Sequence, residues 1–297
     1  MNHQRLSYVL ITPARNEQAY LEKTILSVVS QTVLPNKWII VSDGSTDLTD
    51  EIASKYAAQH DFIEFLRMPD HHEREFTAKV HCFNAGYLRV VDSRFDIIGN
   101  LDADLTFEPD YIEYLLEKFV LFPELGVAGT PFVEEGTSYD YRFTNIEHVS
   151  GACQLFRRKC FEDIGGYLPI KGGGIDWVAV TSARMKGWQT RTFTDKVIHH
   201  HRKMGTGKGN KIKALYRQGR QDYYLGNHPV WEFLRMFYQM RFSLPVIGGM
   251  VLFSGYCFAA LQGLEHPVPM ELVKFIRQEQ MGRLLSRFQS IGRRIHL

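Results

Sequence analysis

Two carboxylates separated by one residue, Asp102 and Asp104, follow an apolar run that ends at Leu101. Carboxylates at this spacing can hold a hard divalent cation and a ligand hydroxyl, and Mg²⁺ is usually held by one or two carboxylates together with substrate phosphates. An Asp-x-Asp triplet also occurs on surface turns, where Asp caps helices. The position of this DXD motif directly after a strand-like run favours a Mg²⁺ or Mn²⁺ site.

A third acid, Asp43, opens the turn Asp-Gly-Ser-Thr-Asp at residues 43–47. The turn residues predict a strand-to-helix connection, in which Gly44 supplies a positive φ and Thr46 or Asp47 caps the next helix. Asp43 is not needed to form the turn or to cap the helix. A carboxylate at the end of a strand can accept the imino N–H of a pyrimidine base, so Asp43 is a candidate base-reading residue.

Asp176 stands at the start of a predicted helix over residues 176–186. A carboxylate at a helix N-terminus stays ionised because the helix dipole favours negative charge, and an ionised carboxylate can take the proton of a hydroxyl group. The position alone is equally consistent with a helix-capping Asp.

Three consecutive histidines, His199, His200 and His201, close the last predicted strand, 190–198. Side chains alternate along a strand, so His199 and His201 share one face and His200 lies on the other. Three such residues cannot all bind one Zn²⁺ ion, and no cysteine partner supports a zinc site.

Alternating strands and helices must position these residues. The pattern of apolar residues predicts helices and strands in alternation, with strands at 8–12, 38–42, 63–68 and 96–101 and helices at 17–31, 49–60 and 77–91. Such alternation predicts β-α-β units and a mainly parallel sheet covered on both faces. Ligands bind such sheets at the carboxyl ends of the strands, where the loops 13–17, 43–47 and 102–104 would meet.

The composition fits an ordinary globular protein. The chain has 297 residues, of which 44% are hydrophobic and 23% charged, with a formal net charge of +2. These values exclude a disordered or collagen-like chain. Four cysteines without a C-x-x-C pair indicate neither a zinc ribbon nor a disulfide framework, and favour a reducing compartment. No apolar stretch of signal-peptide length opens the chain, so we expect a cytoplasmic catalytic part.

Three segments together resemble one family. Thr-Pro-Ala-Arg-Asn-Glu at 12–17, the turn at 43–47 and Asp-Ala-Asp at 102–104 are similar to the nucleotide-sugar half of a family 2 glycosyltransferase of the GT-A fold, over about residues 6–225. The resemblance implies an α/β, Rossmann-like, mostly parallel mixed sheet flanked by helices. It also implies a metal-dependent inverting enzyme that transfers a sugar from a nucleotide-diphospho-sugar to a hydroxyl acceptor in bacterial polysaccharide or glycolipid synthesis.

The resemblance also implies roles for individual residues. The residues expected to bind the nucleotide sugar are Thr12, Pro13, Ala14, Glu17, Asp43, Lys79, Asp102, Ala103 and Arg202. Asp102 would reach the ribose or sugar, and Asp104 would bind the divalent cation on the diphosphate. A His-x-x-Arg pattern formed with Arg202 favours His199 over His201 as a further metal ligand. Lys79 opens a Lys-x-x-x-x-Asn stretch seen in polymerising members of the family, which implies that it contacts the nucleotide. The alternative interpretation is that Lys79 is a solvated lysine on a helix.

The second half of the resemblance surrounds Asp176. Gly165-Gly166-Tyr167 is similar to the family's GG-aromatic turn, and Ile175 stands where the family usually has Glu, while Asp176 is retained as the expected catalytic base. The departure at Ile175 keeps open a catalytically inactive membrane-associated scaffold. A nucleotidyltransferase is a second alternative, but it would need a glycine-rich basic loop near the N-terminus, which residues 13–17 do not form.

Seven basic and no acidic residues lie between 202 and 220. The run lacks the interleaved aromatic residues of single-strand binders, so we expect no nucleic acid partner. A basic loop over the leaving diphosphate would stabilise the charge that develops there. Because Asp43 suits uracil or thymine, a UDP-sugar is the expected donor.

The C-terminal part is predicted to be a separate helical region, 226–297, following a glycosyltransferase domain at 1–225. Residues 242–264 contain no charged residue, and the tail 265–297 carries six Lys or Arg against three Glu. A re-entrant or interfacial hairpin followed by a basic amphipathic helix would bind the inner face of the cell membrane. The apolar side of that helix is formed by Leu272, Phe275, Ile276, Leu284, Leu285 and Phe288. The acceptor would then be a sugar or a lipid-linked sugar. A buried core helix is the alternative for 242–264.

Overall fold

The structure is a computed structural model, and it describes residues 6–69, 76–134, 137–138, 145–202, 211–241 and 246–295. Contacts between Cα atoms divide the chain into two compact units, Met1–Met204 and Gly205–Leu297. The loops and strand ends that carry the predicted site all belong to the first unit.

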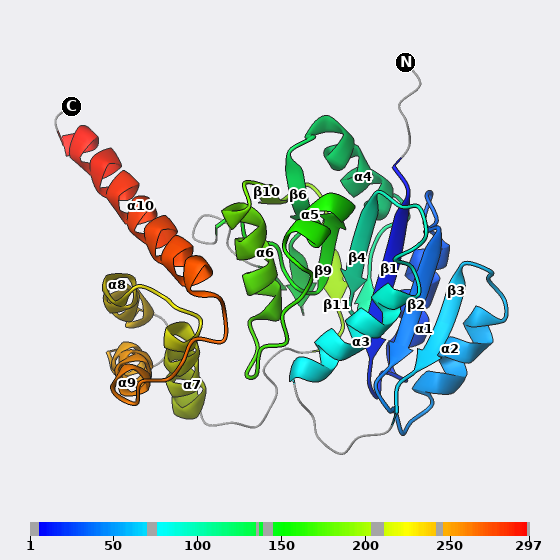
Figure 1. Cartoon of the computed structure of the whole chain (residues 1–297), viewed down its shortest axis with the longest axis horizontal. Coiled ribbons are helices and arrows are strands. Elements are labelled where there is room, and N and C mark those ends of the chain that lie inside the picture. The colour runs from blue at the N-terminus through cyan, green and yellow to red at the C-terminus, as the bar shows by residue number, and fades with distance from the viewer. Residues whose placement is uncertain are drawn as a thin grey trace. The chain divides into compact units, whose positions relative to one another are not determined.

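A seven-stranded sheet forms the centre of the first unit, with the strand order β10-β6-β9-β4-β1-β2-β3 (Figure 1). The strands are β1 (Tyr8–Ala14), β2 (Lys37–Ser42), β3 (Ile63–Arg67), β4 (Ile97–Leu101), β6 (Leu125–Gly129), β9 (Cys153–Arg157) and β10 (Gln189–Thr192). Strands β4, β1, β2 and β3 are mutually parallel, β10 is parallel to β6, and β9 is antiparallel to both β4 and β6. The predicted mixed, mostly parallel sheet is therefore confirmed.

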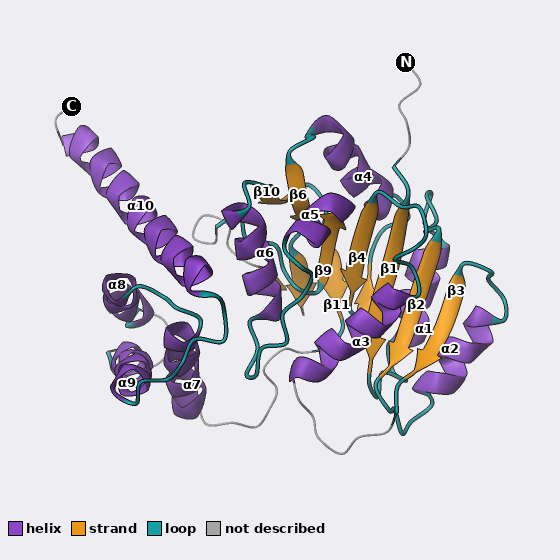
Figure 2. Ribbon diagram, viewed as in Figure 1, coloured by secondary structure: helices purple, strands orange, loops and turns teal. Residues whose placement is uncertain are grey.

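Helices cover both faces of this sheet (Figure 2). They are α1 (Leu21–Val29), α2 (Thr49–Ala57), α3 (Phe76–Leu88), α4 (Tyr111–Leu121), α5 (Arg158–Asp163) and α6 (Ile175–Met185). Tyr8 and Leu10 of β1 share one apolar cluster with residues of α1, α2 and α4, whereas Val9 and Ile11 share the other with α3, α5 and α6. Since alternate residues of β1 enter opposite layers, the continuous apolar run in the sequence is explained by burial on both sides.

A second, four-stranded sheet has the order β5-β11-β7-β8. Its strands are β5 (Leu105–Thr106), β7 (Phe132–Glu134), β8 (Thr137–Ser138) and β11 (Ile198–His200). The prediction of one strand over 190–198 is wrong, because this stretch contains β10 and the start of β11, which lie in different sheets. The turn between them is fixed by a hydrogen bond from the Tyr114 hydroxyl to Asp195 (2.7 Å) and by an ion pair between Lys196 and Asp110.

The second unit contains α7 (Lys211–Tyr224), α8 (Pro229–Gln239), α9 (Ile247–Leu261) and α10 (Met270–Ile295). Helix α7 packs closely on α9 through glycines. A Cβ added to Gly219 would lie 1.8 Å from the Leu252 carbonyl oxygen, and one added to Gly255 would lie 2.2 Å from the Tyr216 oxygen. Because α7 packs with the later helices, the compact units divide before it, earlier than the boundary expected after residue 225.

The apolar segment 242–264 forms α9, while residues 242–245 lie outside the described residues. Within the part of the chain that the structure describes, no helix combines the length and apolar character needed to cross a bilayer. Leu272 and Ile276 of α10, expected to face lipid, are buried instead, and the adjacent Val273 packs against Gly226. The first half of α10 therefore uses its apolar side for folding.

Candidate active site

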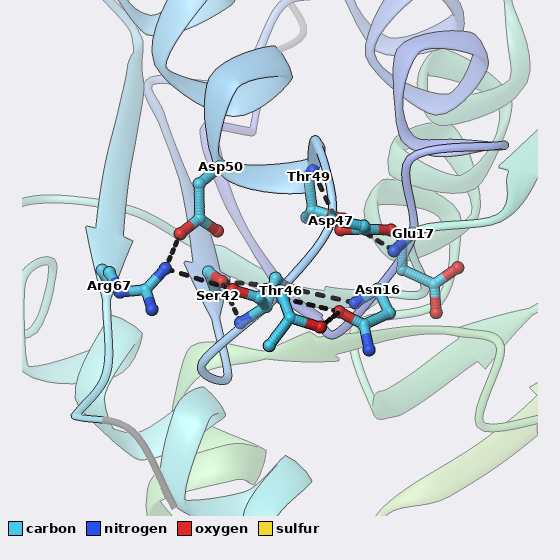
Figure 3. A network of polar contacts seen from close by, with 9 residues as sticks. Asn16, Glu17, Ser42, Thr46, Asp47, Thr49, Asp50 and Arg67 are labelled. Atoms are coloured by element: carbon cyan, nitrogen blue, oxygen red, sulfur yellow. Dashed lines mark hydrogen bonds and ion pairs between the residues drawn. The ribbon is translucent and has the colours of Figure 1, made fainter.

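The loops that follow β1 and β2 are joined by hydrogen bonds at the carboxyl edge of the sheet (Figure 3). The Asn16 amide donates to the Ser45 hydroxyl (3.1 Å), and the Glu17 amide donates to Thr49 Oγ1 (2.7 Å). The Thr46 amide donates back to Asn16 Oδ1 (2.9 Å). Two sequence-distant loops thus form one rigid edge.

The predicted positive φ at Gly44 is confirmed, whereas the N-cap of α2 is Leu48 and not Thr46 or Asp47. Gly44 has a φ of +62°, and Asp47 Oδ1 accepts the Thr49 amide (3.0 Å) at the start of α2. Asn16 also has a positive φ, of +56°, which Asn tolerates better than most residues. These side chains shape the loops.

Asp43 lies at this edge, where its Oδ2 accepts a hydrogen bond from Arg15 Nη1 (3.2 Å) and its Oδ1 accepts one from the Cys82 thiol (3.5 Å). Burial and the Asp43 charge together raise the pKa of Cys82 to about 12, so this thiol remains protonated and can donate. Arg15, which the sequence reasoning did not single out, sits beside the predicted base reader. The position of Arg15 within the segment 12–17, which carries the family resemblance, could have identified it as a site residue.

The DXD carboxylates meet a histidine. Ligand atoms of Asp102, Asp104 and His200 all lie within 4.8 Å of one another, and His200 Nε2 is 3.6 Å from Asp104 Oδ2. The histidine expected in this place was His199, but its side chain is exposed. The reason is the alternation along β11, where Ile198 is buried and His200 follows it on the same face.

The donors around Asp104 fit a divalent cation. His200 Nδ1 is buried and has no hydrogen-bond partner among the described residues. Burial raises the pKa of Asp104, and the Asp102 charge raises it further, although His200 and Arg202 oppose this. Two crowded carboxylates with the His200 Nε2 beside them are groups that can bind Mg²⁺ or Mn²⁺.

Glu17 and Arg202 meet beside this cluster. The Arg202 guanidinium pairs with the Glu17 carboxylate and lies 3.8 Å from Asp104 Oδ2. Burial, together with the negative charges of Asp104 and Asp102, raises the pKa of Glu17 to about 7 against the opposing effect of Arg202. Arg202, the first residue of the basic run, therefore contacts the acidic cluster, whereas Lys203 and Lys208 lie outside the described residues and the run from Lys211 onward belongs to α7.

Lys79 reaches the cluster from α3. Its ammonium forms an ion pair with Asp102 Oδ1 (2.5 Å), and the charges of Asp102, Asp176 and Asp104 raise its pKa against the effect of burial. The Lys79 side chain is 42% exposed, so this ion pair with Asp102 is open to solvent.

A cavity of about 340 Å³ joins the DXD end to Asp176. Its lining includes Lys79, Asp102, His148, Asp176 and His200. This volume is at the lower end of the range for small-molecule sites.

Residues of β9 and the segment before it contact the first turn of α6, which carries Asp176. Gln154 is fully buried and donates to the Val149 carbonyl (2.9 Å) and, at 3.5 Å, to the Asp176 carbonyl. Its own carbonyl accepts the Tyr167 hydroxyl (2.7 Å). Gly151 lies so close that an added Cβ would be 2.8 Å from Asp176 Oδ2. These neighbours fix the position of the Asp176 carboxylate.

The remaining predicted residues lie near the site without lining the cavity. The Thr12 hydroxyl is buried and accepts the Trp38 indole N–H (2.9 Å). Ala14 and Ala103 are buried, and Pro13 is half-buried at the end of β1.

Comparisons with known proteins find glycosyltransferases. Residues 9–146 match the model of the family described as glycosyl transferase family 2. The poly-β-1,6-N-acetyl-D-glucosamine synthase of Staphylococcus epidermidis is 26% identical over 184 residues, which cover 55% of this chain and 42% of that protein. The Staphylococcus aureus (strain COL) protein of the same name is 27% identical over 170 residues, covering 50% and 39%. The chain thus spans less than half the length of these relatives.

Solved structures share the fold. The mannosyltransferase PcManGT from Pyrobaculum calidifontis, in complex with GDP-Man and Mn²⁺, superposes with a TM-score of 0.57 at 17% identity, covering 86% of this chain and 74% of that one. Residues 1–349 of S. aureus TarS, in complex with UDP-GlcNAc, give a TM-score of 0.54 at 13% identity, covering 86% and 73%. The match to glycosyl transferase family 2 thus lies in residues 9–146, and the solved glycosyltransferase structures share the fold of most of the chain.

Proposed function

We propose that the protein transfers a sugar from a nucleotide-diphospho-sugar to a hydroxyl acceptor with inversion at the anomeric carbon. One observation supports this proposal most strongly. The cavity is lined by Asp102, His200 and Asp176, and Asp104 lies close to the first two of these residues. A cation-binding cluster for the diphosphate and a separate carboxylate for the acceptor are the two parts that a single displacement needs.

In this reaction the acceptor oxygen forms a bond to the anomeric carbon while the bond from that carbon to the diphosphate oxygen breaks. Asp176 takes the acceptor hydroxyl proton, and the nucleoside diphosphate leaves with the bonding electron pair. Asp102, Asp104 and His200 would hold a divalent cation, which neutralises charge on the departing diphosphate. Arg202 and Lys79 add positive charge to the same end of the cavity.

We infer that the donor is a UDP-sugar. Asp43 offers a carboxylate at the end of β2, and its Arg15 and Cys82 partners hold it in place at the loop edge. A carboxylate accepts the imino N–H of uracil. Two relatives named as poly-β-1,6-N-acetyl-D-glucosamine synthases and the TarS structure with UDP-GlcNAc make UDP-N-acetylglucosamine the first donor to test.

Calorimetry with UDP, GDP and dTDP, with and without Mn²⁺, tests the nucleotide part. We expect UDP binding that depends on Mn²⁺ and is lost in Asp104→Ala. The matched control is Asp92→Ala, which removes an exposed Asp outside the cavity and should bind as wild type does. Absence of nucleotide binding under every condition would favour the inactive scaffold, with Ile175 as the departure to pursue.

The catalytic part is tested by Asp176→Asn. This variant should bind UDP and Mn²⁺ as wild type does but lose transfer, because an amide cannot take the acceptor proton. Proton NMR of the first product formed would report the anomeric configuration. Retention of configuration, or full transfer by Asp176→Asn, would contradict the inverting mechanism.

We propose further that the second unit attaches the enzyme to the cytoplasmic face of the membrane, where the acceptor is a lipid-linked sugar. The support is a set of exposed apolar side chains on two helices that pack together, namely Val230, Phe233 and Phe237 of α8 and Ile247, Met250 and Leu261 of α9. Such side chains enter the interfacial region of a bilayer.

Flotation with vesicles of phosphatidylglycerol and phosphatidylcholine tests the attachment. The full chain should float with the vesicles, and Phe233→Ser/Phe237→Ser should float much less. Leu88→Ser removes an exposed leucine of the first unit and serves as the control. Equal flotation of both variants would exclude these phenylalanines as the attachment surface.

A further inference from the structure

A histidine outside every predicted motif lies in the wall of the cavity. His148 precedes β9, and its side chain lines the same space as Asp176. The segment around it is not one of the three motifs that carry the family resemblance.

The backbone on either side of His148 is fixed by β10. The Thr192 hydroxyl donates to the His148 carbonyl (2.5 Å), and the Thr190 hydroxyl donates to the Glu147 carbonyl (2.7 Å). The His148 amide donates to the Asn145 carbonyl (3.0 Å). The imidazole is therefore carried on a rigid support, as a group that positions a ligand must be.

The imidazole is neutral near neutral pH. Burial lowers its pKa, the Arg184 charge lowers it further, and Asp176 acts in the opposite direction without reversing the shift. A neutral imidazole offers one N–H donor and one nitrogen acceptor. No hydrogen bond joins the ring to another of the described residues, and the ring lines the cavity beside Asp176.

The charges around His148 associate it with the acceptor half of the cavity. The ionised groups that act on its pKa are Asp176 and Arg184, both on α6, and not Asp102 or Asp104 of the DXD motif. A ligand that contacts His148 is thus beside the proposed base.

We propose that His148 binds the acceptor by hydrogen-bonding a second hydroxyl, next to the hydroxyl that Asp176 deprotonates. The acceptor is then a polyol with neighbouring hydroxyls, such as a sugar ring, rather than a simple alcohol. This inference rests on the proposed function, because it assumes that Asp176 activates an acceptor hydroxyl. His148 orients that hydroxyl toward the anomeric carbon.

Steady-state kinetics with UDP-N-acetylglucosamine test the proposal. The acceptor is whichever of the octyl β-glycosides of glucose, galactose and N-acetylglucosamine the wild type uses best. His148→Phe should raise the acceptor KM by about tenfold, as loss of one hydrogen bond implies, while the donor KM and the hydrolysis of donor without acceptor stay within about twofold. His148→Gln, which retains a donor and an acceptor, should recover most of the loss.

Deoxy analogues of the same octyl glycoside give the sharper comparison. Wild type should use the analogue that lacks the neighbouring hydroxyl about tenfold less well, and His148→Phe should no longer distinguish the two acceptors. His60→Ala, which changes a histidine outside the cavity lining, should distinguish them as wild type does.

Three results would overturn the inference. Unchanged acceptor KM in His148→Phe would show that the imidazole does not touch the acceptor. A parallel loss of donor hydrolysis, or a raised donor KM, would assign His148 to the donor half. Continued discrimination against the deoxy acceptor in His148→Phe would show that another group reads that hydroxyl. Each result leaves UDP binding and its loss in Asp104→Ala intact, so failure here is distinguishable from failure of the proposed function.

Discussion

At the scale of single residues, the choice between adjacent histidines on β11 is decided by which face of the strand is buried. We predict that His200→Ala lowers the affinity for Mn²⁺ in the presence of UDP by about tenfold or more, because it removes a ligand from a three-residue cluster. Electron paramagnetic resonance of free Mn²⁺ measures this directly. His199→Ala, which changes the exposed neighbour, is the matched control and should leave the affinity unchanged.

Lys79 supplies a second prediction at this scale. Its ammonium is paired with Asp102 and lies within reach of the charges of Asp104 and Asp176. Removing this positive charge in Lys79→Met should strengthen Mn²⁺ binding to the nucleotide-free protein several-fold, because like charges compete for the same carboxylates. Titration without nucleotide tests this. Lys159→Met, on the exposed surface of α5, should have no effect, and a weaker affinity in Lys79→Met would contradict the argument.

The sequence was informative for residues whose chemistry depends on motif position alone. Asp102, Asp104, Asp176 and Lys79 were predicted and meet around one cavity or its neighbouring cluster. His200 was missed because a strand of three histidines gives no register. His148 and Gln154 were missed because their roles come from a segment that β10 and Tyr167 hold in place, and such support is a tertiary property.

At the scale of elements, the first turn of α6 sets where the proposed base stands. Gly151→Ala would place a methyl group 2.7 Å from the Asp176 Cβ, so the carboxylate must move. Since a displacement of about 1 Å at a reacting group can cost about a hundredfold in rate, we expect transfer to fall by this order while UDP binding persists. Turnover and calorimetry on the same preparation test both halves of the prediction.

The control for this variant is Gly282→Ala in α10, where an added Cβ meets nothing within 4 Å. It should leave transfer unchanged and slightly stabilise the helix, because Ala has the higher helix propensity. Undiminished transfer in Gly151→Ala would mean that the Asp176 carboxylate tolerates displacement.

The first strands of the main sheet were predicted well because β1, β2 and β4 are buried apolar runs, and β1, β2 and β3 are each followed by a helix. The prediction of a single strand was wrong for residues 190–198, because this segment contributes strands to two different sheets. Residues 190–198 are read as one strand by their pattern, but the contacts of Tyr114 and Asp110 with the turn separate β10 from β11. Such contacts join segments about 80 residues apart, and no local pattern encodes them.

At the scale of the whole molecule, the second unit contains a buried acidic group that links its stability to pH. Burial, together with the charge of the neighbouring Asp222, raises the pKa of Glu232 to about 8 against the opposing effect of Arg235. Because the folded form holds this proton more tightly than an unfolded chain would, the stability that the proton contributes is complete below about pH 4.5. It is lost progressively as the pH rises toward 8.

Glu232→Gln should remove this dependence, because glutamine stays neutral and keeps an amide oxygen for Asn227. Thermal unfolding of the full chain from pH 5 to pH 9 should show the variant gaining stability relative to wild type as the pH rises. Glu271→Gln, at an exposed position on α10, should follow wild type throughout. A difference between Glu232→Gln and wild type that does not vary with pH would refute the assignment.

The place of β11 in the small sheet has a consequence for how the protein is made. This strand is the last of the first unit along the chain, yet it lies between β5 and β7, which come much earlier. On the ribosome, Asp102 and Asp104 emerge almost one hundred residues before His200. A nascent chain therefore lacks the third member of the Asp102, Asp104 and His200 group until synthesis has passed β11, and the strand that completes the small sheet also brings in this histidine.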